Sequence, residues 1–210
     1  MIQKEYWDGV SALKNFTTPF QADEFAELVE KDALIADIGC GYGRTLEELR
    51  LRGYKNLVGF DLSEGMVERG RRQSPYLDLR VMDGEHISLA GESADAVILF
   101  AVLTCIAADE EQRRLIAEIR RILKPGGILY VNDFLLNSDE RNIRRYEKYL
   151  DEYGIYGVFE LPEGAVLRHH SEEHVKLLLS GFEELRYEHL TFTTMNGNSS
   201  NGFYYLGRKP

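Results

Sequence analysis

Short apolar runs alternate with amphipathic segments through the first two thirds of the chain. The runs that predict strands lie at 33–38, 56–61, 76–82, 94–100 and 128–134. Segments with helical spacing of apolar residues lie between them, at 20–29, 45–51, from 63 onward and at 110–123. Residues 96–100 are all apolar, which is typical of a strand buried on both faces. This alternation predicts a parallel sheet with helices on both faces.

The pattern changes after residue 134. A highly charged segment at 138–152 has helical spacing but few apolar positions, so we interpret 135–170 as a helical insertion that lies on top of the sheet as a lid. Ser171 is placed to cap a further helix, and two closing strands are expected at 182–193 and 203–207. We therefore expect a single domain over 1–210. Its parts are an N-terminal arm and helix (1–30), a core (33–134), the insertion (135–170) and a C-terminal helix and hairpin (171–210).

The charge of the chain argues against a nucleic-acid substrate. The formal net charge is -10 over 210 residues, whereas nucleic-acid enzymes usually carry a basic surface that neutralises phosphates. Six arginines form two groups within predicted helices that are also rich in acidic residues, and we interpret them as solvated helix faces. These are Arg69, Arg71 and Arg72, and Arg141, Arg144 and Arg145.

Two cysteines, Cys40 and Cys105, stand far apart and outside any metal-binding spacing. Residues 1–7 do not resemble a signal peptide. The longest apolar stretch, 94–108, contains Asp95 and is too short to span a bilayer. We therefore expect a cytoplasmic protein with no membrane partner and no metal site.

A glycine-rich turn follows the first predicted strand. Residues 37–44 read Asp-Ile-Gly-Cys-Gly-Tyr-Gly-Arg and lead from a strand into a helix. Glycines allow a ligand to approach the backbone closely, and a helix start offers free N–H groups, although a purely structural turn shows the same pattern. The dinucleotide fingerprint requires glycine where this chain has Arg44. Asp37 is placed to receive an ammonium group, whereas it would repel a pyrophosphate.

Acidic residues also end the next two strands. Asp61 closes the second strand, where a carboxylate accepts hydrogen bonds from a ribose diol; the alternative is a capping role beside Ser63. Asp83 follows the third strand and is placed to accept from an adenine amine, with Met82 and Leu62 against the ring, although an isolated Asp-Gly turn is common. Because parallel strands end at one edge, the three motifs predict a cleft for an adenosine that carries an amino acid rather than phosphates.

Five segments in this order resemble the class I S-adenosylmethionine-dependent methyltransferases of small-molecule type. They are 37–43, 59–66, 82–84, 100–106 and the Leu-Lys-Pro-Gly-Gly turn at 123–127. The resemblance implies an α/β fold with a Rossmann-like sheet of seven mostly parallel strands, the last one antiparallel. It also implies S-adenosylmethionine as cofactor. The residues that match the family's cofactor motifs are Asp37, Gly39, Gly41, Gly43, Arg44, Asp61, Leu62, Met66, Met82, Asp83, Gly84 and Phe100.

Methyl transfer from a sulfonium is an in-line displacement in which the cofactor supplies the reactivity. The protein orients the reactants and excludes water, so no fixed catalytic triad is expected. His169 is the preferred candidate for a general base and Asp133 is a second one; the alternative for His169 is a surface histidine beside Ser171. Other residues expected on the acceptor side are Thr104, Cys105, Asn132, Arg168 and His170.

Tyr6 and Trp7, in the N-terminal arm, either close over the cofactor or anchor the arm by packing. The Asn/Asp-Pro-Pro-aromatic motif of nucleic-acid amino methyltransferases is absent, because 100–103 reads Phe-Ala-Val-Leu. The acidic charge and the insertion favour a small-molecule acceptor, with the protein as a monomer or a homodimer. Two alternatives remain: a protein that binds the cofactor without catalysis, and a nicotinamide-dependent oxidoreductase, which Arg44 and Asp83 disfavour.

Overall fold

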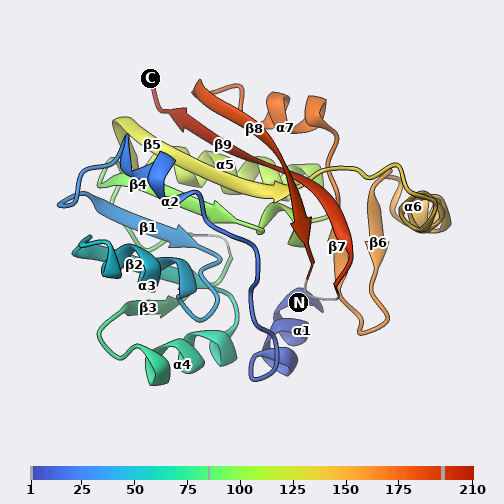
Figure 1. Cartoon of the computed structure of the whole chain (residues 1–210), viewed down its shortest axis with the longest axis horizontal. Coiled ribbons are helices and arrows are strands. Elements are labelled where there is room, and N and C mark those ends of the chain that lie inside the picture. The colour runs from blue at the N-terminus through green and yellow to red at the C-terminus, as the bar shows by residue number, and fades with distance from the viewer. Residues whose placement is uncertain (1, 85, 195–196) are drawn as a thin grey trace.

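The structure is a computed structural model that describes residues 2–84, 86–194 and 197–210 (Figure 1). A seven-stranded sheet with the order β3-β2-β1-β4-β5-β9-β8 forms its centre. In chain order the strands are β1 (Leu34–Ile38), β2 (Asn56–Asp61), β3 (Asp78–Val81), β4 (Ala94–Phe100), β5 (Leu123–Phe134), β8 (Glu183–Thr193) and β9 (Ser199–Arg208). Strands β1 to β5 pair in parallel, and β9 runs antiparallel to both β5 and β8. The predicted Rossmann-like α/β sheet with an antiparallel last strand is confirmed.

Helices cover both faces of the sheet. Helices α5 (Asp109–Ile122) and α7 (Glu172–Leu178) pack one apolar cluster against β4 and β5, while α2 (Ala22–Ala26) and α3 (Arg44–Leu51) pack another on the opposite face. Val97 and Leu99 belong to the first cluster, whereas Ala96 and Ile98 belong to the second. Successive side chains of a strand point to opposite faces, so the apolar run of β4 serves both cores.

The C-terminal ends of the parallel strands meet at one edge of the sheet. Strand order reverses between β1 and β4, which is the place where open α/β sheets bind ligands. Helix α4 (Glu64–Gln73) follows β2, and the 3-10 turn η1 (Leu103–Cys105) follows β4 at this edge. The motifs at the ends of β1, β2 and β3 are therefore neighbours in space.

The insertion is not purely helical, and it lies beside the strand ends rather than on top of the sheet (Figure 1). It contains α6 (Glu140–Tyr153) and a two-stranded sheet of β6 (Val158–Glu160) and β7 (Val166–Arg168). The charged helix was predicted, but strands of three residues are too short to show a period of two. After β7, His170 forms a bridge with Leu135, which returns the chain to the end of β5.

Three further expectations need correction. The first residues form helix α1 (Ile2–Val10) instead of an irregular arm, and the helix expected at 20–29 is confined to α2. Strand β5 begins at Leu123 because this residue pairs with Ala94 before a register shift, so the glycine turn at 124–127 lies inside the strand. None of the described helices is long and apolar enough to cross a membrane.

Candidate active site

Asp61 joins the three motifs at the strand ends. Its Oδ2 accepts a hydrogen bond from the Gly41 N–H at 2.7 Å, and its Oδ1 accepts one from the Ser63 N–H at 2.8 Å. Its backbone carbonyl accepts from the Met82 N–H at 2.9 Å. Burial raises the pKa of Asp61 although these N–H groups favour the carboxylate. The side chain thus has the place expected for a ribose-binding carboxylate, while Ser63 is the residue that caps α4.

The glycine loop needs its glycines for two reasons. Gly39, Gly41 and Gly43 have φ of +73°, +55° and +80°, a region that favours glycine. A Cβ on Gly39 would lie 2.4 Å from a methyl group of Val102, and one on Gly41 would lie 2.4 Å from the ring of Phe16. Both neighbours come from other segments, so the loop is closely packed as well as tightly turned.

Asp37 is a buried carboxylate with an unsatisfied oxygen. It is 1% exposed, and its Oδ1 has no hydrogen-bond partner among the described residues. Burial and the nearby Asp61 raise the pKa of Asp37 to about 8, while Arg44 opposes this shift. A buried charge of this kind is costly unless a cation compensates it, and the ammonium of an amino-acid moiety is such a cation.

Arg44 and Asn132 add two more unsatisfied atoms near the strand ends. The Arg44 guanidinium lies 5.2 Å from the centre of the Phe100 ring, and its buried Nε has no partner among the described residues. Asn132 is fully buried at the end of β5, donates to Gln21 Oε1 at 2.9 Å and leaves its Oδ1 unsatisfied. Together with Asp37, these groups suit a ligand that carries both an ammonium and a carboxylate.

The adenine motif lies against the ribose motif. A Cβ on Gly84 would lie 3.0 Å from a Leu62 methyl group, so the two segments touch. Asp83 is exposed and accepts a hydrogen bond from the His86 N–H at 3.0 Å, and Met82 is half-buried. Met66 lies on the buried face of α4 and is 1% exposed, and its contact with a cofactor stays a prediction.

The segment after β4 is held in an unusual backbone conformation. Ala101 has φ of +54°, which is uncommon for a residue other than glycine. Asp133 is fully buried and accepts the Thr104 N–H at 3.2 Å and the Phe134 N–H at 2.8 Å. Burial raises the pKa of Asp133 to about 7, opposed by these N–H groups and by those of Val102 and Leu103. Asp133 thus anchors the turn that lines the end of β4.

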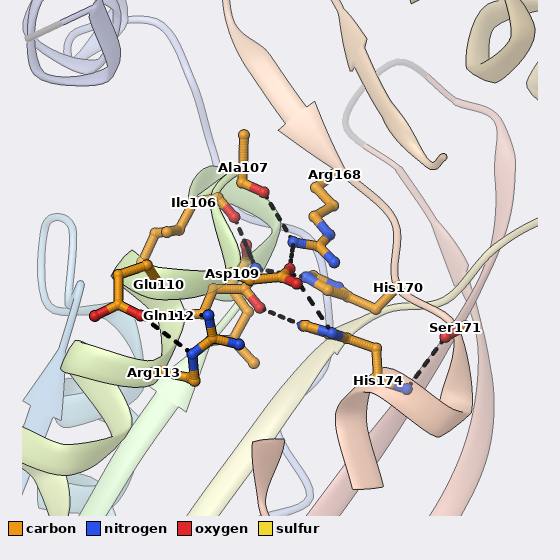
Figure 2. Close-up of polar contacts among 11 residues, drawn as sticks. Ile106, Ala107, Asp109, Glu110, Gln112, Arg113, Arg168, His170, Ser171 and His174 are labelled. Atoms are coloured by element: carbon orange, nitrogen blue, oxygen red, sulfur yellow. Dashed lines mark hydrogen bonds and ion pairs between the residues drawn. The ribbon is translucent and has the colours of Figure 1, made fainter. Parts of the chain in front are cut away.

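Gln112 holds the carbonyl groups of the same segment (Figure 2). Its Nε2 donates to the carbonyls of Leu103 at 3.1 Å and Ile106 at 2.7 Å, and lies 2.8 Å from His170 Nε2. Since an amide nitrogen is only a donor, His170 Nε2 accepts and its Nδ1 carries the proton toward the Phe134 carbonyl at 3.2 Å. Burial lowers the pKa of His170 to about 3, so this histidine is a neutral structural group.

Arg168 completes this anchoring network. Its Nη1 donates to the Ala107 carbonyl at 2.8 Å and to Asp109 Oδ1 at 2.6 Å (Figure 2). Its own carbonyl accepts from the Thr104 hydroxyl at 2.9 Å. The irregular segment 101–108 is therefore fixed by buried side chains from β5, α5 and β7. A segment held from three sides is preorganised, which is what orientation of an acceptor requires.

His169 lies inside the insertion. It is 5% exposed, its Nδ1 lies 2.7 Å from the Tyr146 hydroxyl, and its ring stacks on Phe134 with centroids 5.5 Å apart. Burial and the charge of Arg145 lower the pKa of His169 well below its usual value. The alternative of a surface histidine is wrong, while the role of general base stays a prediction.

The interpretation of the arginine groups as solvated faces is wrong for Arg69 and Arg145, which are only partly exposed, whereas Arg71 is exposed. Arg69 donates to the carbonyls of Ser11 at 2.9 Å and Lys14 at 2.6 Å. Arg71 Nη2 donates to the Leu79 carbonyl at 2.6 Å, and the Arg145 guanidinium lies 3.5 Å from the centre of the Phe159 ring. These cations have internal contacts, which the acidic composition of their helices did not indicate.

Helix α1 supplies Asp8, which no sequence signal indicated, beside Tyr6 and Trp7, which the sequence had singled out. Asp8 Oδ1 accepts from the Ser63 hydroxyl at 2.6 Å and from the Gly65 N–H at 3.0 Å. Burial and the charge of Asp133 raise the pKa of the Cys105 thiol to about 12, while the nearby Trp7 side chain opposes this shift. Among the described residues, no cluster of histidine, cysteine and carboxylate side chains is arranged to hold a metal ion.

Comparisons with known proteins agree with this geometry. Residues 36–131 match the family described as a methyltransferase domain. The crystal structure of an S-adenosylmethionine-dependent methyltransferase from Methanosarcina mazei superposes with a TM-score of 0.85 and 25% identity, covering 92% of this chain and 99% of that one.

Curated relatives match over a shorter part. "Probable tRNA methyltransferase 9B" of Mus musculus is 29% identical over 125 residues, which is 60% of this chain and 26% of the relative. Demethylmenaquinone methyltransferase of Renibacterium salmoninarum is 32% identical over 100 residues, 48% of this chain and 40% of the relative. The chain thus spans less than half the length of these relatives.

Residues 36–131 therefore form a methyltransferase domain, and the fold of the chain is that of an S-adenosylmethionine-dependent methyltransferase, for which S-adenosylmethionine is the cofactor. The residues present suit this cofactor, because the unsatisfied Asp37 and Arg44 complement its amino-acid moiety and Asp61 faces the position of a ribose.

Proposed function

We propose that this protein transfers the methyl group of S-adenosylmethionine to a small-molecule acceptor by in-line displacement. The observation that carries the proposal is the convergence of Asp37, the glycine loop and Asp61 at one sheet edge, with an unsatisfied buried carboxylate among them. A structural turn alone explains neither the buried, unsatisfied carboxyl group of Asp37 nor the link from Asp61 to Gly41.

Each cofactor residue receives a role on this proposal. Asp37 binds the ammonium, Arg44 binds the carboxylate, and Asp61 binds the ribose hydroxyls in exchange for part of its present hydrogen bonding. Gly39, Gly41 and Gly43 allow the backbone to contact the methionine chain. The remaining residues form the walls around the adenine and the methionine chain: Leu62, Met82, Asp83, Gly84 and Phe100, with Met66 supporting α4 from within the core.

The sulfonium of the bound cofactor supplies the reactive methyl group. The protein orients the acceptor against it and keeps water out, and the anchored segment 101–108 is placed to do both. Asp133 already accepts several backbone N–H groups, which favours an anchoring role over proton transfer. His169 is neutral, so it has the protonation state that a general base needs, and it remains the candidate to test.

A small acceptor is favoured by the contacts that enclose the strand ends. Helix α1 reaches the hairpin of β6 and β7, because Gln3 hydrogen-bonds the Val166 carbonyl and Lys14 Nζ lies 4.0 Å from Glu163. The formal net charge of -10 and the internal contacts of Arg69 and Arg145 leave little basic surface for a polyanion. The name of the murine relative raises tRNA as the second candidate acceptor.

The two acceptors can be separated with a deuterated methyl donor. The protein is incubated with trideuteromethyl S-adenosylmethionine and either a metabolite extract or total tRNA, with Asp61→Ala as the inactive control. The proposal predicts label in a compound of the metabolite extract and none in tRNA nucleosides. Label in tRNA alone would replace the small-molecule acceptor by a tRNA, and label in neither would favour a cofactor-binding protein without catalysis.

A further inference from the structure

Helix α1 packs on the start of α4, directly after the ribose motif (Figure 1). One carboxylate oxygen of Asp8 accepts from both the Ser63 hydroxyl at 2.6 Å and the Gly65 N–H at 3.0 Å. A Cβ on Gly65 would lie 2.7 Å from the Ser11 hydroxyl oxygen, so only glycine fits at this contact. The two helices are thus complementary in shape and joined by charge-assisted hydrogen bonds.

The residues after α1 continue across the cofactor motifs. Arg69 of α4 donates to the carbonyls of Ser11 and Lys14, at 2.9 and 2.6 Å. The next residue of note is Phe16, whose ring stacks on Tyr42 with centroids 5.0 Å apart and lies directly on Gly41. We call residues 2–16 the α1 strap, because they run from the ribose motif to the glycine loop.

The same strap contacts the acceptor side. The Trp7 side chain is close enough to the Cys105 thiol of η1 to oppose the rise of its pKa, and Gln3 hydrogen-bonds the carbonyl of Val166 in β7. Tyr6 is half-buried near Cys105 and Glu163. The strap therefore links the elements that would hold the cofactor to those that would hold the acceptor.

We propose that the α1 strap is the closing element of the cofactor site and that Asp8 is the positioning residue that holds it closed. This inference rests on the proposed function. Cofactor exchange requires Phe16 to leave Gly41 and α1 to leave α4. Reclosing returns Trp7 to Cys105, so the acceptor side is completed only when the strap is closed over the cofactor.

Trp7 is the only tryptophan of the chain, so its fluorescence reports the strap directly. We would compare wild type with Asp8→Ala and with Glu5→Ala, a matched control that removes an exposed acidic side chain from the same helix. Asp8→Asn serves as the conservative variant, because its amide oxygen still accepts hydrogen bonds. Acrylamide quenching of Trp7 is measured without ligand and with S-adenosylhomocysteine, and dissociation of S-adenosylhomocysteine is followed by stopped flow. Thermal melting establishes that each variant is folded.

Asp8→Ala should raise quenching of Trp7 in the free protein and speed dissociation of S-adenosylhomocysteine by about tenfold, since two hydrogen bonds to a charged acceptor are lost. For Asp8→Asn, both the quenching of Trp7 and the dissociation rate should lie between those of wild type and Asp8→Ala. Glu5→Ala should match wild type in both. Equal quenching and dissociation for Asp8→Ala and Glu5→Ala would overturn the proposal. If wild type binds no S-adenosylhomocysteine, both the proposed function and the closing role are overturned. Even then, the comparison of Trp7 quenching in the ligand-free proteins decides whether Asp8 holds the α1 strap in place.

Discussion

Replacing Asp37 by asparagine should stabilise the protein while it removes cofactor binding. Asp37 has a pKa of about 8 in the fold, compared with an ordinary value of 3.8, chiefly because it is buried. Between these two values the folded chain binds a proton that the unfolded chain has released. The contribution of Asp37 to stability is therefore fully present below pH 3.8 and is lost as the pH rises toward 8.

The magnitude follows from the shift. At pH 7 the pH lies about three units above the ordinary pKa of an unfolded aspartate, and each unit is worth about 1.4 kcal/mol. The free energy of unfolding that the raised pKa of Asp37 removes at this pH therefore has an upper limit of about 4 kcal/mol. An asparagine of the same shape carries no charge to bury and avoids this cost. We expect Asp37→Asn to raise the free energy of unfolding by about 1–4 kcal/mol near pH 8 and to leave it nearly unchanged near pH 4.

Urea denaturation of both proteins at pH 4, 6 and 8 measures this difference directly. Asp95 provides a control with a different pH window, because its salt bridge with Lys124 and its hydrogen bond from the Leu34 N–H lower its pKa, although burial opposes this. Its contribution to stability is therefore present above pH 3.8 and is lost only at lower pH, so Asp95→Asn should lose nearly the same stability at pH 4, 6 and 8. Calorimetry should show that Asp37→Asn binds S-adenosylhomocysteine at least 100-fold more weakly, because the ammonium loses its counter-charge. The reasoning would be refuted if the free energies of unfolding of wild type and Asp37→Asn changed in parallel with pH. It would also be refuted if Asp37→Asn bound S-adenosylhomocysteine as tightly as wild type.

Three further substitutions test other parts of the site. Asp133→Asn weakens the anchor of segment 101–108, so methyl transfer should slow by about tenfold or more while the affinity for S-adenosylhomocysteine stays within about threefold; a comparable loss of affinity would contradict the anchoring role. Gly41→Ala places a Cβ against Phe16 and should reduce both cofactor affinity and stability, and Phe16→Ala in the same chain should recover part of the stability; no recovery would mean that backbone strain dominates. His169→Ala should cost about 2–3 kcal/mol of stability through its lost ring stacking and hydrogen bond, and an unchanged pH–rate profile would remove it as a base.

The fold and the cofactor motifs were predictable because they depend on local patterns. Strands buried on both faces are apolar at successive positions, as in β4, and glycines at 39, 41 and 43 mark a turn whatever surrounds it. The meeting of Asp37 and Asp61 then follows from parallel strands ending at one edge. No tertiary detail was needed for these steps.

The predictions that failed concern residues whose environment depends on contacts between segments far apart in the sequence. Asp8 and Ser63 are far apart in sequence, and nothing in either local pattern shows that α1 docks on α4. Arg69 looks like a solvated residue until the carbonyls of Ser11 and Lys14 are placed beside it. For His169 the sequence left open a surface position beside the helix cap Ser171, which is excluded only by the packing of Tyr146 and Phe134 that buries it.

The central claim is that the three strand ends form a site for S-adenosylmethionine. Calorimetric titration of wild type and Asp61→Ala with S-adenosylmethionine and S-adenosylhomocysteine tests it most directly, with circular dichroism to establish that both proteins are folded. The account predicts micromolar binding of both ligands by wild type and a loss of at least tenfold in the variant. Folded wild type that binds neither ligand, or a variant that binds as tightly as wild type, would contradict it.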